Sequence, residues 1–281
     1  PAIVWVLTND GKLLACHFSA SSQMIAWSVI TFSGEDHPVW IEAMESDISR
    51  YSTLCLVMKR GGSYSIESLE AVPGSSAFTV PFLDAYVLDP EVDDDGTITL
   101  PQFAGRDVEM VEYQESAESG IAYSSSVTAT ADEDGVITID DRLLKDIGGE
   151  GVRLAAGLRY EMIIGTLRSE LPANGTSQSA IRTIKEVTLR MDRTLGGYIS
   201  LRPSYSSGAF DRASITDNAR TILYRRYGEF RYGELENLFT GDVPTTLRST
   251  NTDDDRIVIF SSDPYPFCIC AIIIDFSIQE V

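Results

Sequence analysis

The chain has 281 residues, of which 43% are hydrophobic and 23% are charged, and its formal net charge is −20. This length and composition predict one large or two ordinary globular domains with a sizeable core, and they exclude a disordered chain. Sequence-independent nucleic-acid binding uses Lys and Arg to neutralise phosphates, so the strong negative charge excludes that class of protein.

Residues 1–72 contain six short strand-like segments at spacings of about ten residues, which is typical of an up-and-down antiparallel meander. Asn9-Asp10-Gly11 joins the first two segments and is a strong hairpin signal. We predict a propeller-like platform of about one and a half blades, which needs further strands from outside this chain, from the C-terminal segment, or from both. The predicted strands are residues 3–7, 12–18, 24–32, 39–44, 53–60 and 63–69.

Residues 73–165 are predicted to form an inserted, acidic β domain with a sandwich or barrel-like architecture. Residues 84–150 contain 18 acidic and 3 basic residues, a net charge of −15, whereas residues 181–281 contain 14 acidic and 12 basic residues, a net charge of −2. Two similar phrases place an acidic Asp-Gly turn before an alternating strand, which indicates repeated turn chemistry. The two turns are Asp93-Asp94-Asp95-Gly96 and Asp132-Glu133-Asp134-Gly135, and one short helical turn is predicted at residues 140–147.

Residues 166–281 are predicted to return to the platform and to supply its C-terminal strands. Residues 183–193 show partial period-two alternation, so we predict a strand, with a helix over residues 179–190 as the alternative. A strand at 256–260 and the apolar run 267–274 follow, and both are suitable partners for the strands of residues 1–72. Asp275 ends that run far short of the about 20 residues of a membrane-spanning helix, so no membrane-spanning segment is expected.

The beginning of the chain carries no signal-peptide pattern. Strand-like sequence starts directly after Pro1, as expected of the C-terminal part of a longer protein or of a chain that has lost its Met.

Motifs for catalysis and metal binding are scarce. The chain has only two histidines, His17 and His37, which we predict to be packed or surface residues, and no GxSxG, HExxH, phosphate-loop or GxGxxG signature follows a strand. The carboxylates gather in turn signals, where solvated acids are typical, and they do not indicate a glycosidase pair. We therefore predict a protein that is not an enzyme and has no catalytic, cofactor-binding or metal residues.

Two further residue patterns bear on ligand binding. Glu91, Asp93, Asp95 and Gly96 match positions 1, 3, 5 and 6 of a calcium-binding EF-hand loop, but position 12 is Gln102 and no helices flank the segment. Incidental cation binding at the Asp-Gly turns stays open. The four cysteines lie on predicted strands without a metal-ligand spacing, and we predict buried free thiols of a protein made in a reducing cytosol. They are Cys16, Cys55, Cys268 and Cys270.

Several stretches carry a resemblance to a known family, and their order along nearly the whole chain adds specificity. The stretches are Ile3-Val4-Trp5-Val6-Leu7 with the following Asp-Gly turn, Ala26-Trp27, Leu56-Val57-Met58-Lys59-Arg60, Ile66-Glu67-Ser68-Leu69, Gly157-Leu158-Arg159-Tyr160, Gly175-Thr176-Ser177-Gln178, Leu238-Phe239-Thr240-Gly241-Asp242 and Asp263-Pro264-Tyr265-Pro266-Phe267. The ordered set resembles the C-terminal portion of the phage tail nozzle family, also called tail tubular protein B or tail stabilisation proteins, of short-tailed phages. The high acidity of residues 84–150 and the Cys268–Cys270 pair depart from the family pattern.

This resemblance implies an all-β structural virion protein in the phage tail, made in the host cytoplasm. It implies a homohexameric ring below the portal that contacts the tail adaptor and the tail fibre or spike proteins. Genomic DNA would pass through the ring during ejection without specific binding. The alternatives are a receptor-binding or adhesin-like β protein of the tail and, less favoured, a tail-associated hydrolase.

Two segments have expected roles in such a ring. An acidic wall disfavours the approach of phosphates, so we expect the turns at residues 93–95 or 132–134 to face the channel. Aromatic and Arg side chains are enriched at interfaces, so residues 224–232 are expected either to contact a neighbouring subunit or to pack on their own domain.

Overall fold

The structure is a computed structural model of the chain. It describes residues 2–19, 21, 23–44, 53–69, 81–116, 120–124, 126–140, 143, 152–167, 181–201, 205–206, 209–210, 212–217, 219–222, 236–245 and 256–279. Strands dominate these residues, and helix is confined to short turns such as η1 (Pro101–Phe103) and α2 (Arg212–Asp217). The all-β expectation is confirmed, and no sheet formed by the described residues closes on itself.

Two three-stranded antiparallel meanders form the N-terminal part, and their strands follow the sequence-based expectation closely. The hairpin between the first two strands uses Gly11 at φ +82°, and the Thr8 hydroxyl accepts a hydrogen bond from the Lys12 amide at 2.9 Å. The first sheet contains β1 (Ala2–Leu7), β2 (Leu13–Ser19) and β3 (Met24–Ile30), and the second contains β4 (His37–Met44), β5 (Thr53–Arg60) and β6 (Ser63–Leu69).

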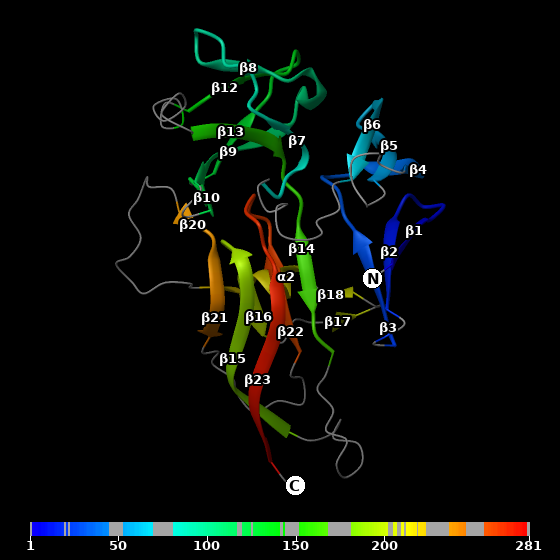
Figure 1. The fold of residues 1–281 in the computed structure, drawn as a ribbon, viewed down its shortest axis with the longest axis vertical. Coiled ribbons are helices and arrows are strands. Elements are labelled where there is room, and N and C mark those ends of the chain that lie inside the picture. Colours follow the sequence, from blue (N-terminus) through cyan, green and yellow to red (C-terminus); the bar gives the residue numbers. More distant parts are fainter. Residues whose placement is uncertain are drawn as a thin grey trace.

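The inner faces of the two meanders meet at one end, where a small apolar core lies between them. Leu13 from β2 packs with Leu54, Leu56 and Met58 from β5, and all four side chains are buried. Trp5, Ile30, Phe32, Ile41 and Leu69 complete this core from the flanking strands and loops. The pair of sheets is called the N-terminal stack below, and it lies beside the rest of the molecule (Figure 1).

The acidic segment folds into a six-stranded sheet with a two-stranded ribbon. The main sheet has the order β20-β10-β9-β13-β7, with β11 also paired to β9. Its strands are β7 (Asp84–Leu88), β9 (Asp107–Ser116), β10 (Gly120–Tyr123), β11 (Val127–Thr130), β13 (Val152–Leu158) and, from later in the chain, β20 (Glu236–Asn237). Asp84 and Leu158 are register partners, so the chain enters and leaves this segment at neighbouring positions.

The two Asp-Gly phrases pair with each other. Their strands, β8 (Thr97–Thr99) and β12 (Val136–Thr138), are antiparallel, and Ile98 lies opposite Ile137 in a buried core. Reciprocal backbone hydrogen bonds extend this pairing: Ile139 donates to the Gly96 carbonyl at 3.0 Å and Leu100 donates to the Gly135 carbonyl at 2.8 Å. The repeated turn chemistry therefore builds one locally two-fold ribbon at the end of the molecule opposite the C-terminus (Figure 1).

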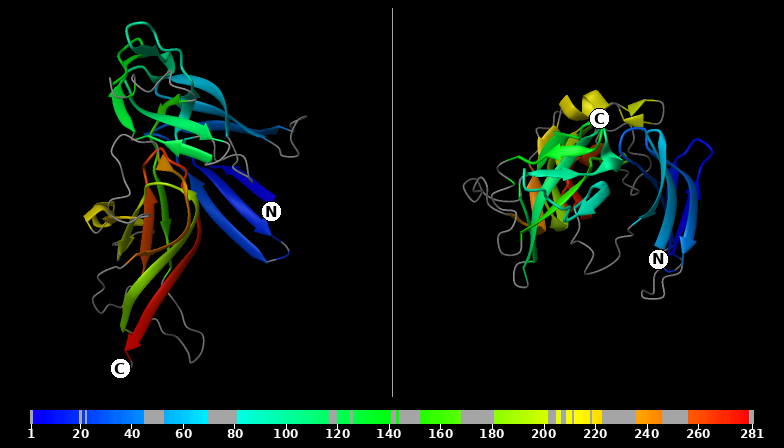
Figure 2. Two further views of the ribbon diagram at one scale, coloured as in Figure 1. Left: turned by 60° about the vertical axis from the view of Figure 1, so that its left-hand side comes forward. Right: turned by 90° about the horizontal axis from the view of Figure 1, so that it is seen from above.

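The remaining strands form two antiparallel sheets that enclose a second large core. One has the order β14-β22-β16-β19 and the other β21-β15-β23. Their strands are β14 (Met162–Gly165), β15 (Ile181–Thr194), β16 (Tyr198–Leu201), β19 (Ala219–Thr221), β21 (Phe239–Thr245), β22 (Ile257–Ser261) and β23 (Ile269–Gln279), and a short hairpin of β17 (Tyr205–Ser206) and β18 (Ala209–Phe210) accompanies them. The long strands β15 and β23 run side by side toward the C-terminus (Figures 1 and 2).

Several expectations for residues 166–281 are settled by these pairings. Residues 183–193 lie in strand β15, so the helical alternative was wrong. Within the described residues, β22 pairs with β14 and β16, and β23 pairs with β15, whereas the expected pairing of these last strands with residues 1–72 is not formed. Three further segments lie outside the described residues: most of the predicted helical turn at 140–147, the stretch Gly175–Gln178, and the Tyr- and Arg-rich segment 224–232.

The cysteines differ partly from expectation. All four are free thiols, but only Cys16 is buried, whereas Cys55 and Cys268 are half-buried and Cys270 is exposed. For Cys270 the reason is a register shift in β23: Ile269 pairs with Met191 and Ala271 with Arg190, so Cys270 is the extra residue and its side chain is exposed.

Candidate functional site

Arg60 is the centre of a buried ionic cluster where the N-terminal stack meets the acidic segment. It is the last residue of β5 and lies on the same face of the strand as the inward-facing Leu54, Leu56 and Met58. Its guanidinium therefore points into the protein, and only 7% of the residue is exposed. A charge this deeply buried needs charged partners and hydrogen bonds, because desolvation alone strongly disfavours it.

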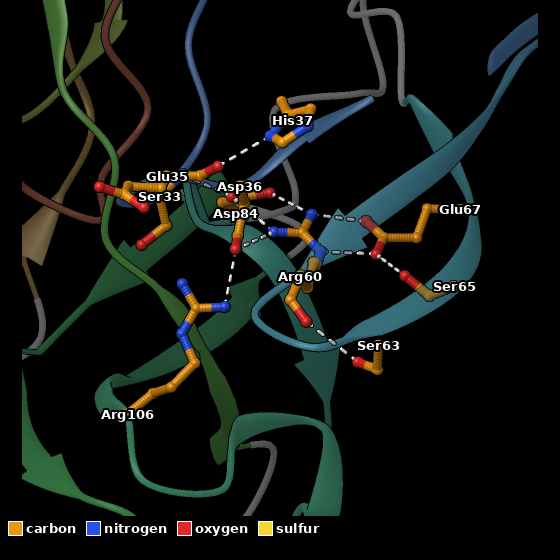
Figure 3. A network of polar contacts seen from close by, with 10 residues as sticks. All are labelled: Ser33, Glu35, Asp36, His37, Arg60, Ser63, Ser65, Glu67, Asp84 and Arg106. Carbon is orange, nitrogen blue, oxygen red and sulfur yellow. Dashed lines mark hydrogen bonds and ion pairs between the residues drawn. The ribbon is translucent and has the colours of Figure 1, made fainter. Parts of the chain in front are cut away.

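Three carboxylates surround the Arg60 guanidinium (Figure 3). Its Nε and Nη2 donate to the two carboxylate oxygens of Glu67 on β6, both at 2.6 Å. Nη2 and Nη1 also donate to Asp84, at 2.8 and 3.0 Å, and Nη1 donates to Asp36 at 2.9 Å. Arg106 adds a second cation, since its Nη1 donates to Asp36 Oδ2 at 2.6 Å.

Neutral donors complete the cluster. The Ser33 amide donates to Asp84 Oδ2 at 2.8 Å, and the Ser65 hydroxyl donates to Glu67 Oε1 at 2.5 Å. The five ionised groups therefore carry a net charge of −1, from Arg60 and Arg106 against Asp36, Glu67 and Asp84. We call these five residues the Arg60 cluster.

Burial and hydrogen bonding act in opposite directions on the pKa values of the cluster. Burial lowers the pKa of Arg60, but its hydrogen bonds to Glu67 and Asp84 outweigh this and raise the pKa above its ordinary value. Burial likewise raises the pKa of Glu67, while the hydrogen bonds from Arg60 and Ser65 outweigh it and hold that pKa below 4.5. Both groups are thereby kept charged.

The cluster joins three parts of the chain. Asp36 lies in the loop between the two meanders, Arg60 and Glu67 belong to the second meander, and Asp84 begins β7 of the acidic segment. Arg106 comes from the turn after η1. The cluster therefore fixes the N-terminal stack to the point where the acidic segment begins.

An open groove of about 590 Å³ lies beside the cluster, between the β5–β6 hairpin and the η1 turn. It contains His37 and Lys59 next to Glu35, Asp36 and Arg106. The His37 ring nitrogen Nδ1 bonds the Glu35 backbone carbonyl at 2.9 Å, and Arg106 is ion-paired to Asp36. These contacts tie His37 and Arg106 to the loop before β4, which fits a structural joint.

The second candidate feature is the outward surface of the N-terminal stack. On the β1–β3 sheet, Ile25 and Trp27 are 64% and 60% exposed, and on the β4–β6 sheet Trp40 and Ile66 are 63% and 84% exposed. Isolated exposed apolar residues are normal, but contiguous apolar patches mark interaction sites. The stack therefore presents candidate assembly surfaces.

The acidic Asp-Gly turns are occupied by local contacts. The Thr97 hydroxyl donates to Asp95 at 2.7 Å, and Asp132 Oδ1 accepts hydrogen bonds from the amides of Asp134 and Val136. Among the residues that the structure describes, no group of three or more His, Cys, Asp and Glu side chains could hold a metal ion. The turns therefore serve the hairpin geometry of the β8–β12 ribbon.

Sequence patterns did not single out the Arg60 cluster. Asp36, Arg60 and Asp84 are far apart along the chain, and only the fold brings them together. One local signal did exist, because Arg60 stands at an inward-facing position of an otherwise apolar strand. A charged residue at such a position indicates a buried ion pair.

No family model matches the sequence, and no curated protein matches it. None of the helices in the described residues has the length and apolar character that a membrane-spanning helix needs.

Proposed function

We propose that this protein is a structural subunit of a phage tail, part of the nozzle through which genomic DNA leaves the virion. The ordered set of nozzle-like motifs along the chain supports this assignment, and the all-β architecture fits it. The observation that carries the proposal is the N-terminal stack: two three-stranded meanders share a small core and leave large apolar side chains on the outside, which suits a subunit of a larger assembly.

The charge of the molecule suits a conduit. DNA in transit has to pass without being held, and an acidic wall repels phosphates over a distance set by the ionic strength. Six copies of a chain with a charge of −20 would surround the channel with strong negative potential. In this proposal the β8–β12 ribbon, with its turns at residues 93–95 and 132–134, lies at the channel or its mouth.

The proposal includes self-assembly into a six-membered ring, with the tail adaptor and the fibre or spike proteins as neighbours. Mass photometry and negative-stain imaging of the purified protein test it. A ring of six copies with a central channel supports the nozzle. A stable trimer, or a ring whose acidic ribbons lie on the outside around a neutral or basic lumen, contradicts it.

One observation favours a second candidate function, a receptor-binding protein of the tail. The β8–β12 ribbon lies at the far end of the elongated molecule from the C-terminus, where it would be accessible to a host surface (Figure 2). Binding of the purified protein to host envelope material would support this candidate. A deletion of the ribbon that leaves such binding intact would contradict it.

A further inference from the structure

The outer face of the β1–β3 sheet is apolar throughout its described side chains. Strand register places Val4, Cys16 and Trp27 in one row across the three strands, and Val6, Leu14 and Val29 in the next. Phe18 and Ile25 form a third, shorter row. A solvated face of an antiparallel sheet normally alternates polar residues outward, so a sheet with two apolar faces is typical of a layer between two others. The described rows on this face contain no charged side chain.

The opposite side of the stack carries an apolar row within a mixed face. Trp40, Val57 and Ile66 form a row across β4, β5 and β6. The rows on either side of it are polar: Glu42, Cys55 and Ser68 on one side, and Lys59 with Tyr64 on the other. Beyond the first of these rows, Met44 is exposed and its sulfur lies 3.1 Å from the Cys55 thiol. Because the inner faces of both sheets meet in the core of Leu13, Leu54, Leu56 and Met58, these two outer faces point in opposite directions.

We infer that the outer face of the β1–β3 sheet in one copy binds the outer face of the β4–β6 sheet in a second copy of this chain. The contact is heterologous, since two different surfaces meet, and it repeats the order of sheets already packed within each chain. In this contact the apolar rows of the β1–β3 sheet meet the Trp40–Val57–Ile66 row of the second copy. The inference rests on the self-assembly in the proposed function and adds which surfaces meet.

The size of the two faces agrees with a specific contact. An aromatic side chain has a surface of about 150–250 Å², and an aliphatic one somewhat less. Multiplied by their exposed fractions, the apolar side chains of the two faces together give an accessible apolar area of about 1,000 Å². A stable protein interface buries roughly 1,200–2,000 Å² in total, and backbone and polar rim atoms supply the remainder. Each face alone reaches the about 300–600 Å² of the largest apolar patch on a typical monomer.

The test uses one variant for each face: Trp27→Asp on β3 and Ile66→Asp on β6. Both side chains point outward, so each variant is expected to fold, which circular dichroism and thermal unfolding would verify. A buried carboxylate at the centre of an interface should raise the dissociation constant of that contact more than about 30-fold. Leu167→Asp is the matched control, since Leu167 is 87% exposed and lies outside both faces.

The mixture of the two variants distinguishes a head-to-tail contact from other arrangements. Mass photometry should show assemblies for wild type and Leu167→Asp, and monomers for each face variant alone. Equal amounts of both variants should form 1:1 pairs and nothing larger, because each pair retains one intact face from each partner. Wild type that stays monomeric, face variants that assemble normally, or a mixture without pairs would overturn the inference.

The same measurements separate this inference from the nozzle proposal. A six-membered wild-type ring that both face variants still form overturns the face-to-face contact and leaves the nozzle standing. Pairs in the mixture, together with a wild-type assembly that is not a six-membered ring, support the contact and contradict the nozzle.

Discussion

Replacing Arg60 by Met tests the structural role of the Arg60 cluster most directly. The substitution removes the cation and keeps an unbranched side chain, so three carboxylates lose a partner, two of them in largely buried positions. Asp36 and Asp84 are nearly buried, and only Asp36 keeps a second cation, Arg106. Removing one partner of a buried ion pair typically costs about 3–5 kcal/mol, because the remaining charge stays desolvated and uncompensated.

The control is an Arg–carboxylate pair of similar chemistry at the surface. Arg153 donates from Nε and Nη2 to Asp89, and both side chains are more than two-fifths exposed. Exposed pairs of this kind contribute about 0–1 kcal/mol, so Arg153→Met should have a small effect, although Arg153 also lies over the ring of Tyr113. The contrast between the two Arg→Met changes isolates the effect of burial.

Urea-induced unfolding followed by circular dichroism measures both variants. We expect Arg60→Met to lower the free energy of unfolding by about 3 kcal/mol or more. Adding Glu67→Gln to Arg60→Met should recover part of that loss, because it removes one of the uncompensated carboxylates. If Arg60→Met costs no more than Arg153→Met, or if the added Glu67→Gln deepens the loss, the cluster is not the buried joint described above.

Two further predictions concern acid stability and packing. The folded state lowers the pKa of Glu67, so this residue contributes stability that is fully present above its ordinary pKa of 4.5 and is lost as pH falls through the lowered value. Glu67→Gln should therefore flatten the decline of the melting temperature below pH 4.5, and an unchanged decline would contradict this assignment. Gly197 has φ +94°, and a Cβ there would lie 2.2 Å from Phe267, so Gly197→Ala should destabilise by more than about 2 kcal/mol. Gly61 has φ +56° with open space around it, and Gly61→Ala should cost about 1 kcal/mol in the same thermal assay; equal costs would refute the packing argument.

Local patterns predicted much of the fold because strands and turns leave short-range signals. The six strands of residues 1–72 and strand β15 follow period-two alternation and Gly-containing turns, which are properties of neighbouring residues. The pairing of β15 with β21 and β23 depends instead on contacts between segments more than 40 residues apart. Such pairings are set by the packing of whole cores, so the expected addition of the last strands to the platform was wrong.

The candidate site was less predictable than the fold. The apolar outer face of the β1–β3 sheet can be predicted in part from β3, because Ile25, Trp27 and Val29 alternate along this strand with the inward-facing residues. The Arg60 cluster has no comparable pattern, because its members come from a loop, two strands and a turn. Only Arg60 itself, as a cation at an inward position, indicated that a buried partner had to exist.

The neighbouring positions of Asp84 and Leu158 give the acidic segment the properties of an exchangeable module. Segments whose two ends lie close together can be removed, replaced or enlarged without moving the structure that carries them. A short turn between these two positions would shorten the chain by about a quarter and keep Asp84, but it would remove Arg106 from the Arg60 cluster and the strand partner of β20. An exchanged segment therefore has to supply a cation in the place of Arg106 and a strand edge for β20 if the frame is to stay constant.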